Sequence, residues 1–172
     1  MADIVDAETR SRMMSGIRGK DTRPEMLVRR YLHACGLRFR LHLGGLPGHP
    51  DLVFPRYRTV VFVHGCFWHR HTGCRLATTP ATRAEFWAGK FARNVARDQS
   101  DAAALTAMGW QVLTIWECET RDPLALDQLF WRIHSAGEQT HDKRVSSQHC
   151  HGAGQVTGTH SPVLGHARPA AP

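Results

Sequence analysis

The segment PDLVFPRYRTVVFVH, residues 50–64, decides the fold of this chain. It contains two short apolar runs, residues 51–54 and 59–64, in which β-branched and aromatic side chains predominate, and such runs favour strands. Residues 55–58, which begin with a proline, separate the two runs with a turn. We therefore expect two neighbouring strands that follow one another in a meander.

The sequence on either side of this segment extends the sheet. Residues 37–43 alternate apolar side chains with arginine and histidine, which predicts a third strand of the same meander. Residues 110–116 predict a further, buried strand, because they form an apolar run that directly follows Gly109. The sheet should therefore contain at least four strands.

Capping signals predict the main helices. Residues 22–25 and 82–85 both have threonine at the first position and glutamate at the fourth, which is the pattern of a capping box. The first of these helices should end before Gly36, and the second should run to about Met108. Shorter helices are expected at residues 7–16 and 122–133. This order of elements predicts an α/β fold in which helices flank one mixed sheet.

Length and composition indicate one ordered domain followed by a tail. The chain has 172 residues, which suits a single core. Residues 138–172 are rich in Ser, Gly, Thr, His, Ala and Pro and should be disordered, because they contain too little apolar surface to fold. We place the domain at residues 1–137, with an N-terminal arm at about residues 1–20. The N-terminus lacks the pattern of a secretory signal, and no apolar run could span a bilayer, so we expect a cytoplasmic protein.

The charge balance favours a polyanionic partner. The formal net charge is +7, and most of the excess lies before residue 138. Contacts between basic side chains and phosphates supply most of the sequence-independent affinity for nucleic acids. Charge alone does not establish this partner, since many basic proteins bind no nucleic acid.

A loop rich in cysteine and histidine predicts a zinc site. Cys66, His71 and Cys74 lie close together in the sequence, and Cys118 follows the strand expected at residues 110–116. Three thiolates and one imidazole suit tetrahedral Zn²⁺ and leave no position for water, so such a site would be structural. The alternative is that these are separate buried cysteines.

Asp51 is a candidate ligand for Mg²⁺. It follows Pro50, and the next strand ends at Val63 and His64. Many restriction-type nucleases hold Mg²⁺ with a Pro-Asp pair followed by a D/E-x-K motif, and here Val63-His64-Gly65 occupies the place of the second motif. A backbone carbonyl at Val63 can still coordinate Mg²⁺, and a histidine can replace the lysine as a base. The alternative is that Asp51 belongs to an ordinary turn.

The long helix expected from residue 82 has two different faces. Asp98 falls on its apolar stripe, where a buried carboxylate needs a partner, and His69 is the natural candidate. Such a carboxylate would fix the histidine tautomer and leave the other ring nitrogen free to accept a proton, although a purely structural pair is the alternative. The opposite face carries basic and amide side chains that suit DNA but are also typical of a solvated surface: Lys90, Arg93, Asn94 and Arg97.

Several blocks of the sequence, taken together, resemble the very-short-patch-repair endonuclease family. The blocks occur in order over residues 1 to about 120, and the tail shows no such likeness. They include HGCFWH at 64–69, PATRAEFW at 80–87, GWQVL at 109–113, LPGHPD at 46–51 and WEC at 116–118, with Arg10-Ser11, Met14 and Asp21-Thr22 nearer the N-terminus.

The resemblance implies a restriction-endonuclease-like fold and an activity that hydrolyses one phosphodiester bond 5′ of the thymine in a T·G mismatch, where 5-methylcytosine has been deaminated. It implies that Asp51 and the Val63 carbonyl hold Mg²⁺, and that His69, backed by Asp98, activates water. His64 and Glu25 would support that site. The four zinc ligands would be Cys66, His71, Cys74 and Cys118.

The resemblance also implies how the DNA is bound. Phe67, Trp68 and Trp87 would intercalate, and Met14 in the N-terminal arm would enter from the minor groove. A mismatched step is easier to unstack than a paired one, so aromatic wedges would select the mismatch. The alternative is that these aromatic residues belong to the hydrophobic core, as most such residues do.

Two other functions fit the same residues. One is a restriction-type nuclease that cuts fully paired DNA, and the other is a non-catalytic, zinc-stabilised DNA-binding module. For the favoured function we expect a monomer, associated with the nucleoid of a prokaryotic cell, with T·G-mismatched duplex DNA as its substrate and other mismatch-repair proteins as candidate partners.

Overall fold

The computed structural model describes residues 6, 8–9, 12 and 19–148, and it describes side chains up to Gly137. The elements in chain order are α2 (Arg23–Ala34), β1 (Arg40–Leu41), β2 (Leu52–Phe54), the 3₁₀ turn η1 (Pro55–Tyr57), β3 (Thr59–His64), α3 (Ala84–Ala107), β4 (Gln111–Trp116) and α4 (Pro123–Gln148). The expected arm at residues 1–20 and the helix expected at 7–16 fall mostly outside the described residues.

The four strands form one mixed sheet in the order β1-β2-β3-β4. The first three strands are antiparallel, with Val53 opposite Val60, and they form the expected meander. β4 lies parallel to β3, so that His64 and Trp116 end the two strands side by side. Because parallel strands end at the same edge, the segments that follow β3 and β4 leave the sheet together.

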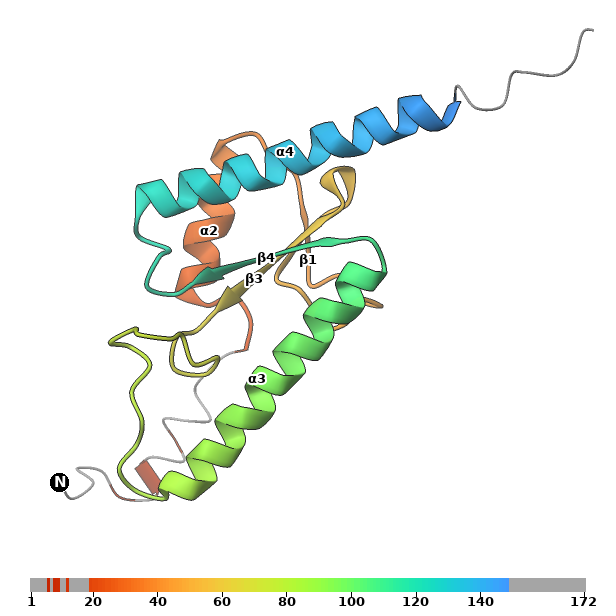
Figure 1. The fold of residues 1–172 in the computed structure, drawn as a ribbon. Helices are drawn as coiled ribbons and strands as arrows, with labels where there is room; N and C mark the ends of the chain where they lie inside the picture. Colours follow the sequence, from red (N-terminus) through yellow and green to blue (C-terminus); the bar gives the residue numbers. More distant parts are fainter. Residues whose placement is uncertain (1–5, 7, 10–11, 13–18, 149–172) are drawn as a thin grey trace, which may run out of the picture.

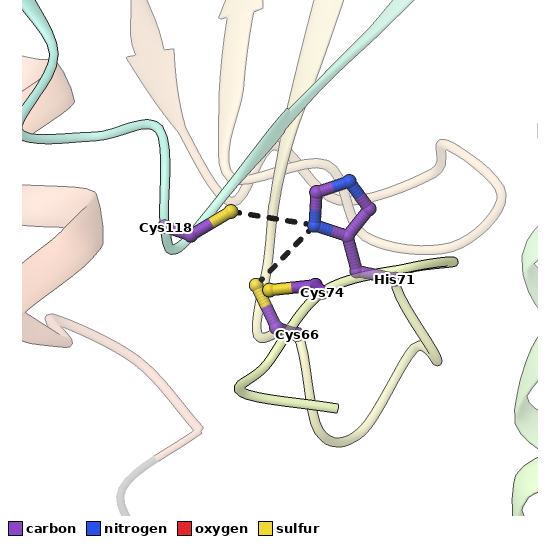
Figure 2. A group of neighbouring side chains, drawn as sticks. All are labelled: Cys66, His71, Cys74 and Cys118. Carbon is purple, nitrogen blue, oxygen red and sulfur yellow. Dashed lines mark hydrogen bonds between the residues drawn. The ribbon is translucent and has the colours of Figure 1, made fainter. Parts of the chain in front are cut away.

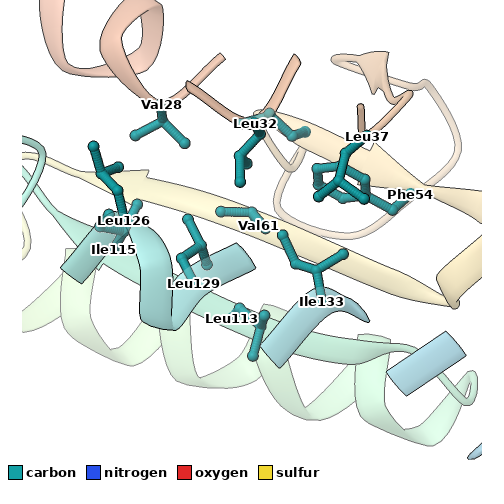
Figure 3. Packing of buried hydrophobic residues seen from close by; sticks show 11 residues of the cluster. Val28, Leu32, Leu37, Phe54, Val61, Leu113, Ile115, Leu126, Leu129 and Ile133 are labelled. Carbon is teal, nitrogen blue, oxygen red and sulfur yellow. The ribbon is translucent and has the colours of Figure 1, made fainter. Parts of the chain in front are cut away.

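Helices cover both faces of this sheet, as Figure 1 shows. α2 and α4 pack on one face over a cluster that includes Leu32, Val61 and Ile133 (Figure 3). α3 contributes Leu105 to a smaller cluster on the other face, against Val53 and Val60. Neighbouring residues of one strand therefore point into different cores, as the alternation of side chains in a strand requires.

The capping box of α2 is present as expected. Thr22 is the N-cap, and its hydroxyl oxygen accepts a hydrogen bond from the Glu25 N–H. The Glu25 carboxylate in turn accepts hydrogen bonds from the Asp21 N–H at 3.0 Å and the Thr22 hydroxyl at 2.8 Å. This box fixes the position of Glu25, which is only 3% exposed.

The capping box expected for α3 is wrong. The N-cap is Arg83, which has a left-handed backbone with φ 53° and makes no side-chain capping bond. A capping box needs an extended N-cap residue, and the left-handed Arg83 moves the start of the helix to Ala84 instead. The helix then ends at Ala107, close to the expected residue.

Two other boundaries differ from expectation. β1 is restricted to Arg40–Leu41, because Leu37 is buried in the core cluster and His42 has a positive φ of 43° that ends the extended backbone. α4 continues beyond Ile133 to Gln148. Residues 134–148 contain one glycine and no proline, so nothing in their composition forces the helical backbone to stop. α4 thus includes the backbone of residues 138–148, which belong to the segment 138–172 for which the sequence predicts disorder, and residues 149–172 lie outside the described residues.

Within the described part of the chain, no helix is both long and apolar enough to cross a lipid bilayer.

Candidate active site and metal centre

Asp51 lies where the sheet opens into a cavity. It directly precedes β2, and its Oδ2 accepts a hydrogen bond of 2.7 Å from the Val63 N–H in β3. The cavity has a volume of about 790 Å³, and its lining includes Asp51, Val63 and several candidate site residues: Glu25, His64, His69 and Asp98. The hairpin thus brings together the two positions, Asp51 and Val63, that the sequence singled out for Mg²⁺.

The environment of Asp51 disfavours an unpaired negative charge. Burial and the nearby Glu25 carboxylate raise the pKa of Asp51 from 3.8 to about 6, and the burial contributes more than the neighbouring charge. The hydrogen bond from the Val63 N–H acts in the opposite direction and lowers the pKa. A buried acid beside a second acid is an arrangement that a bound cation would stabilise.

His69 and Asp98 form the expected pair. The His69 Nδ1 lies 2.6 Å from the Asp98 Oδ2, which joins the loop after β3 to the inner face of α3. With Nδ1 occupied, Nε2 is the ring nitrogen that remains to exchange a proton with a molecule in the cavity.

His64 packs face to face with His69. Their ring centroids are 3.9 Å apart and their planes differ by 10°. Burial, followed by the charge of His69, lowers the pKa of His64 from 6.5 to about 4. His64 is therefore neutral at neutral pH, and a neutral ring can stack on His69 without charge repulsion.

Glu25 is held by a cation that the sequence analysis did not identify. Arg29 is 6% exposed, and its Nη2 lies 2.6 Å from a Glu25 carboxylate oxygen. The same guanidinium pairs with Asp21 and lies 3.1 Å from the His42 Nε2. Arg29 shares the buried face of α2 with Val28 and Leu32, and an arginine gives no apolar signal in the sequence by which to place it there.

Four metal-binding side chains converge beside this cavity (Figure 2). Their candidate ligand atoms all lie within 4.8 Å of one another. The His71 Nδ1 is 3.6 Å from the Cys66 Sγ and 3.3 Å from the Cys118 Sγ, and Cys74 lies next to Cys66. We call these four residues the Cys/His cluster. Three sulfurs and one imidazole nitrogen are a donor set that suits Zn²⁺.

The thiols of the Cys/His cluster are crowded. Burial is the main cause that raises the pKa of both Cys66 and Cys118, and hydrogen bonds from backbone N–H groups lower that of Cys74. A dication would reverse the effect of burial, because thiolates bind metal in the deprotonated form.

The candidate wedge residues form one aromatic group between the loop and α3. Trp68 and Trp87 lie at centroid distances of 5.0 and 5.6 Å from Phe67. All three side chains are half-buried, so they are neither fully packed in the core nor fully exposed on the surface. Phe86, which the sequence analysis missed, is 46% exposed and packs edge-on against Trp87.

Two residues of the candidate DNA face of α3, Lys90 and Asn94, contact Trp68 within the protein. The Lys90 Nζ lies 4.9 Å from the Trp68 ring centroid, and the Asn94 side-chain amide donates to the Trp68 carbonyl oxygen at 3.2 Å. Arg97 donates to Asn94, whereas Arg93 is exposed. These residues therefore border the aromatic group, and they are not on a face remote from it. Met14, the candidate minor-groove residue, lies outside the described residues.

Comparison with known proteins adds an independent finding. A family model described as DNA mismatch endonuclease Vsr matches residues 2–75. The Type II nicking enzyme V.XorIIP of Xanthomonas oryzae pv. oryzae is 51% identical over 127 residues, which cover 74% of this chain and 93% of that protein. DNA mismatch endonuclease Vsr of Escherichia coli K12 is 48% identical over 121 residues, or 70% of this chain and 77% of that protein. The Type II nicking enzyme V.NmeAIP of Neisseria meningitidis is 39% identical over 122 residues, which cover 71% of this chain and 86% of that protein.

Proposed function

The chain belongs to the DNA mismatch endonuclease Vsr family and is therefore a nuclease; from this premise we propose that it nicks duplex DNA 5′ of the thymine in a T·G mismatch. The proposed reaction is Mg²⁺-dependent hydrolysis of one phosphodiester bond, at sites where 5-methylcytosine has been deaminated. The observation that carries this proposal is the cavity in which Asp51 faces the paired His69 and Asp98.

The metal site would consist of Asp51 and the carbonyl oxygen of Val63. The raised pKa of Asp51 supports this assignment, because a bound cation would compensate the buried carboxylate. When bound, Mg²⁺ would polarise the phosphate and neutralise charge that develops on it. Glu25, held in place by Arg29, would support the site from α2.

His69 would act as the general base. Asp98 holds its Nδ1, so that Nε2 can take a proton from the water that attacks phosphorus. Asp98 would stabilise the imidazolium that forms, and His64 would support the ring by stacking on it. The electron pair of the broken P–O bond passes to the leaving oxygen, which is protonated by solvent.

The Cys/His cluster would bind one structural Zn²⁺. Its four protein ligands leave no open coordination position, so it would not take part in the hydrolysis. Its role would be to hold the loop that carries Phe67, Trp68 and His69.

The aromatic group would select the mismatch. Phe67, Trp68 and Trp87 would insert into the base stack, which is easier to open at a T·G step than at a paired step. Lys90, Arg93 and Asn94 would contact the DNA beside this wedge, and Met14 would approach from the minor groove. Arg97 would contribute positive charge to the same surface.

We further propose that the fold is restriction-endonuclease-like and that the protein acts as a monomer on DNA, in the cytoplasm and associated with the nucleoid. The mixed four-stranded sheet, with the candidate site at the ends of β2 and β3, supports this assignment of the fold. Other mismatch-repair proteins are candidate partners.

A nicking assay tests the proposed function. Labelled duplexes that differ only in one T·G or T·A pair are incubated with the protein, with and without Mg²⁺. We expect a nick 5′ of the mispaired thymine, only in the T·G duplex and only with Mg²⁺. Asp51→Ala should bind the T·G duplex like the parent but should not nick it, because it lacks a metal ligand.

The other outcomes identify the alternatives. Equal cleavage of both duplexes would indicate a restriction-type nuclease, and binding without cleavage under all conditions would indicate a DNA-binding module. Near-normal cleavage by Asp51→Ala would contradict the proposed metal site.

A further inference from the structure

A row of rings in contact, two pairs stacked and one edge-on, connects the Cys/His cluster with the proposed base. Trp116 is the last residue of β4 and lies beside His64, the last residue of β3. Its indole stacks on the His71 ring, with centroids 4.2 Å apart and planes 3° apart. It also meets the His64 ring edge-on, at 5.4 Å and 71°. Trp116 therefore contacts one ring from each of the two sites.

The row continues to the proposed base. His64 stacks on His69 at 3.9 Å, and Asp98 holds the far side of His69 through Nδ1. The order in space is thus His71, Trp116, His64 and His69. Asp98 at the end of the row restrains the ring at Nδ1 alone, and a single hydrogen bond still tolerates some rotation of the ring about the Cβ–Cγ bond.

The stacking contacts restrain this rotation. The second side-chain torsion of histidine has a broad energy minimum, so packing decides the plane of the ring. His64 can fix the plane of His69 only if its own ring is fixed, and the edge contact with Trp116 does this. Trp116 is in turn held flat against His71, whose Nδ1 faces the thiols of the cluster.

The backbone at the same place reinforces the arrangement. The Glu117 N–H donates to the His64 carbonyl oxygen at 2.8 Å, and the Glu117 carboxylate accepts from the Cys66 N–H at 3.3 Å. The residue that follows β4 is therefore hydrogen-bonded to one residue of each site, His64 and Cys66. This keeps the indole of Trp116 in register with the rings on either side.

We propose that Trp116 is a positioning residue that fixes the ring plane of His64 and, through it, of His69, and that it makes this alignment depend on the Cys/His cluster. The inference rests on the proposed function, because it takes His69 as the general base. It predicts that Trp116 affects the rate of cleavage and not the binding of DNA.

Substitutions that remove or reduce the flat ring test the proposal. Trp116→Met replaces the indole with a flexible apolar chain, and Trp116→Phe keeps a smaller ring. Single-turnover cleavage and affinity are measured with the T·G duplex, together with bound zinc. We expect Trp116→Met to lower the rate about tenfold or more, the scale of a misplaced catalytic group, with affinity within about twofold and zinc retained. Trp116→Phe should lie between Trp116→Met and the parent.

Trp110→Leu is the matched control for damage to β4. Trp110 precedes the other end of β4, where Arg58 lies 4.7 Å from its ring centroid, far along the strand from the site. Its loss should lower stability but leave the cleavage rate within about threefold, measured below the melting temperature of every variant. An equal loss of rate in Trp110→Leu would overturn the proposal, because the effect would then be a general one on the strand.

A double-mutant cycle separates this inference from the proposed function. If Trp116 acts through His69, Trp116→Met should cause no further loss in a His69→Ala background. Additive losses would overturn the proposal, as would a normal rate in Trp116→Met. If His69→Ala itself cleaves normally, the proposed function fails and this inference fails with it. Should Trp116→Met not fold, Trp116→Phe carries the same test: we expect a loss of about threefold that disappears in the His69→Ala background, and an unchanged rate overturns the proposal.

Discussion

The Cys/His cluster and the cavity around Asp51 lie at the same end of the sheet but are built differently. Three of the four cluster residues come from one short loop after β3, and their ligand atoms lie within 4.8 Å of one another. The cavity has a volume of about 790 Å³, and residues of α2, β3, α3 and the loop after β3 line it. The first arrangement is closed and mostly local, whereas the second is open and assembled from distant parts of the chain.

The difference matches the two roles proposed above. A closed set of four metal ligands would contribute to folding, because it leaves no position for a substrate or water. An open cavity with a partly uncompensated acid and a paired histidine would suit the proposed hydrolysis instead. If this comparison holds, variants of the cluster should lose stability, and variants of the cavity should lose rate while keeping the fold.

The largest expected effect is on stability. Cys118→Ser should lose the bound zinc and lower the melting temperature by about 10 °C or more, since each kcal/mol corresponds to about 2–4 °C in a domain of this size. Elemental analysis and calorimetry measure the two changes. Cys35→Ser is the matched control, because Cys35 is exposed at the end of α2 and should affect neither quantity. No zinc in the parent would mean that the four residues are separate thiols and an unligated histidine, and unchanged zinc in Cys118→Ser would contradict the assignment of Cys118 as a ligand.

The next effect is on rate. His69→Ala should lower single-turnover cleavage by roughly 10²-fold or more, the usual scale for loss of a general base, while zinc content and affinity for the T·G duplex stay close to those of the parent. A variant that chiefly loses affinity would contradict the role of His69 as the base and would weaken the contrast between the two sites.

A third prediction concerns the open cavity without its metal. The pKa of Asp51 is raised in the folded state, so its protonated form favours folding, and the stability that this confers is present below about pH 3.8 and lost as the pH rises through about 6. Asp51→Asn should therefore be more stable than the parent above pH 6 in Mg²⁺-free buffer, by at most about 3 kcal/mol, with no difference near pH 3.8. Added Mg²⁺ should stabilise the parent more than the variant.

Chemical denaturation at several pH values measures this difference. Equal stability of Asp51→Asn and the parent at pH 7.5 would show that Asp51 carries no uncompensated charge in the metal-free cavity.

The smallest effect concerns the aromatic group between the loop and α3. Trp68→Ala should weaken binding to the T·G duplex by roughly tenfold to a hundredfold, because one stacking contact contributes about 1 to 3 kcal/mol, with a smaller loss on paired DNA. Trp131→Ala is the control, since Trp131 is 60% exposed on α4, away from the site. Equal affinity of Trp68→Ala and the parent for both duplexes would assign Trp68 to the core.

Predictions were confirmed where they depended on residues that are close together in the sequence. β3 has the predicted bounds of residues 59–64, and Thr22 caps α2 as expected, because both depend on side chains that are near in sequence. The start of α3 was wrong because the left-handed backbone of Arg83 overrides the capping box expected from Thr82 and Glu85. The end of α4 was wrong because the loss of apolar periodicity after Ile133 does not by itself stop a helix that meets no proline.

The sequence by itself determined which residues are candidates for chemistry. Residue types and short spacings were enough to select Asp51, His69 and Asp98 and the Cys/His cluster, because thiolates, imidazoles and carboxylates have fixed preferences for metals and protons. Only the tertiary structure decided how these groups meet. The pairing of β3 with β4 places Trp116 between His64 and His71, and α3 brings Asp98 to His69. Such contacts join residues that are distant in the chain, so their geometry is set by packing and not by local sequence.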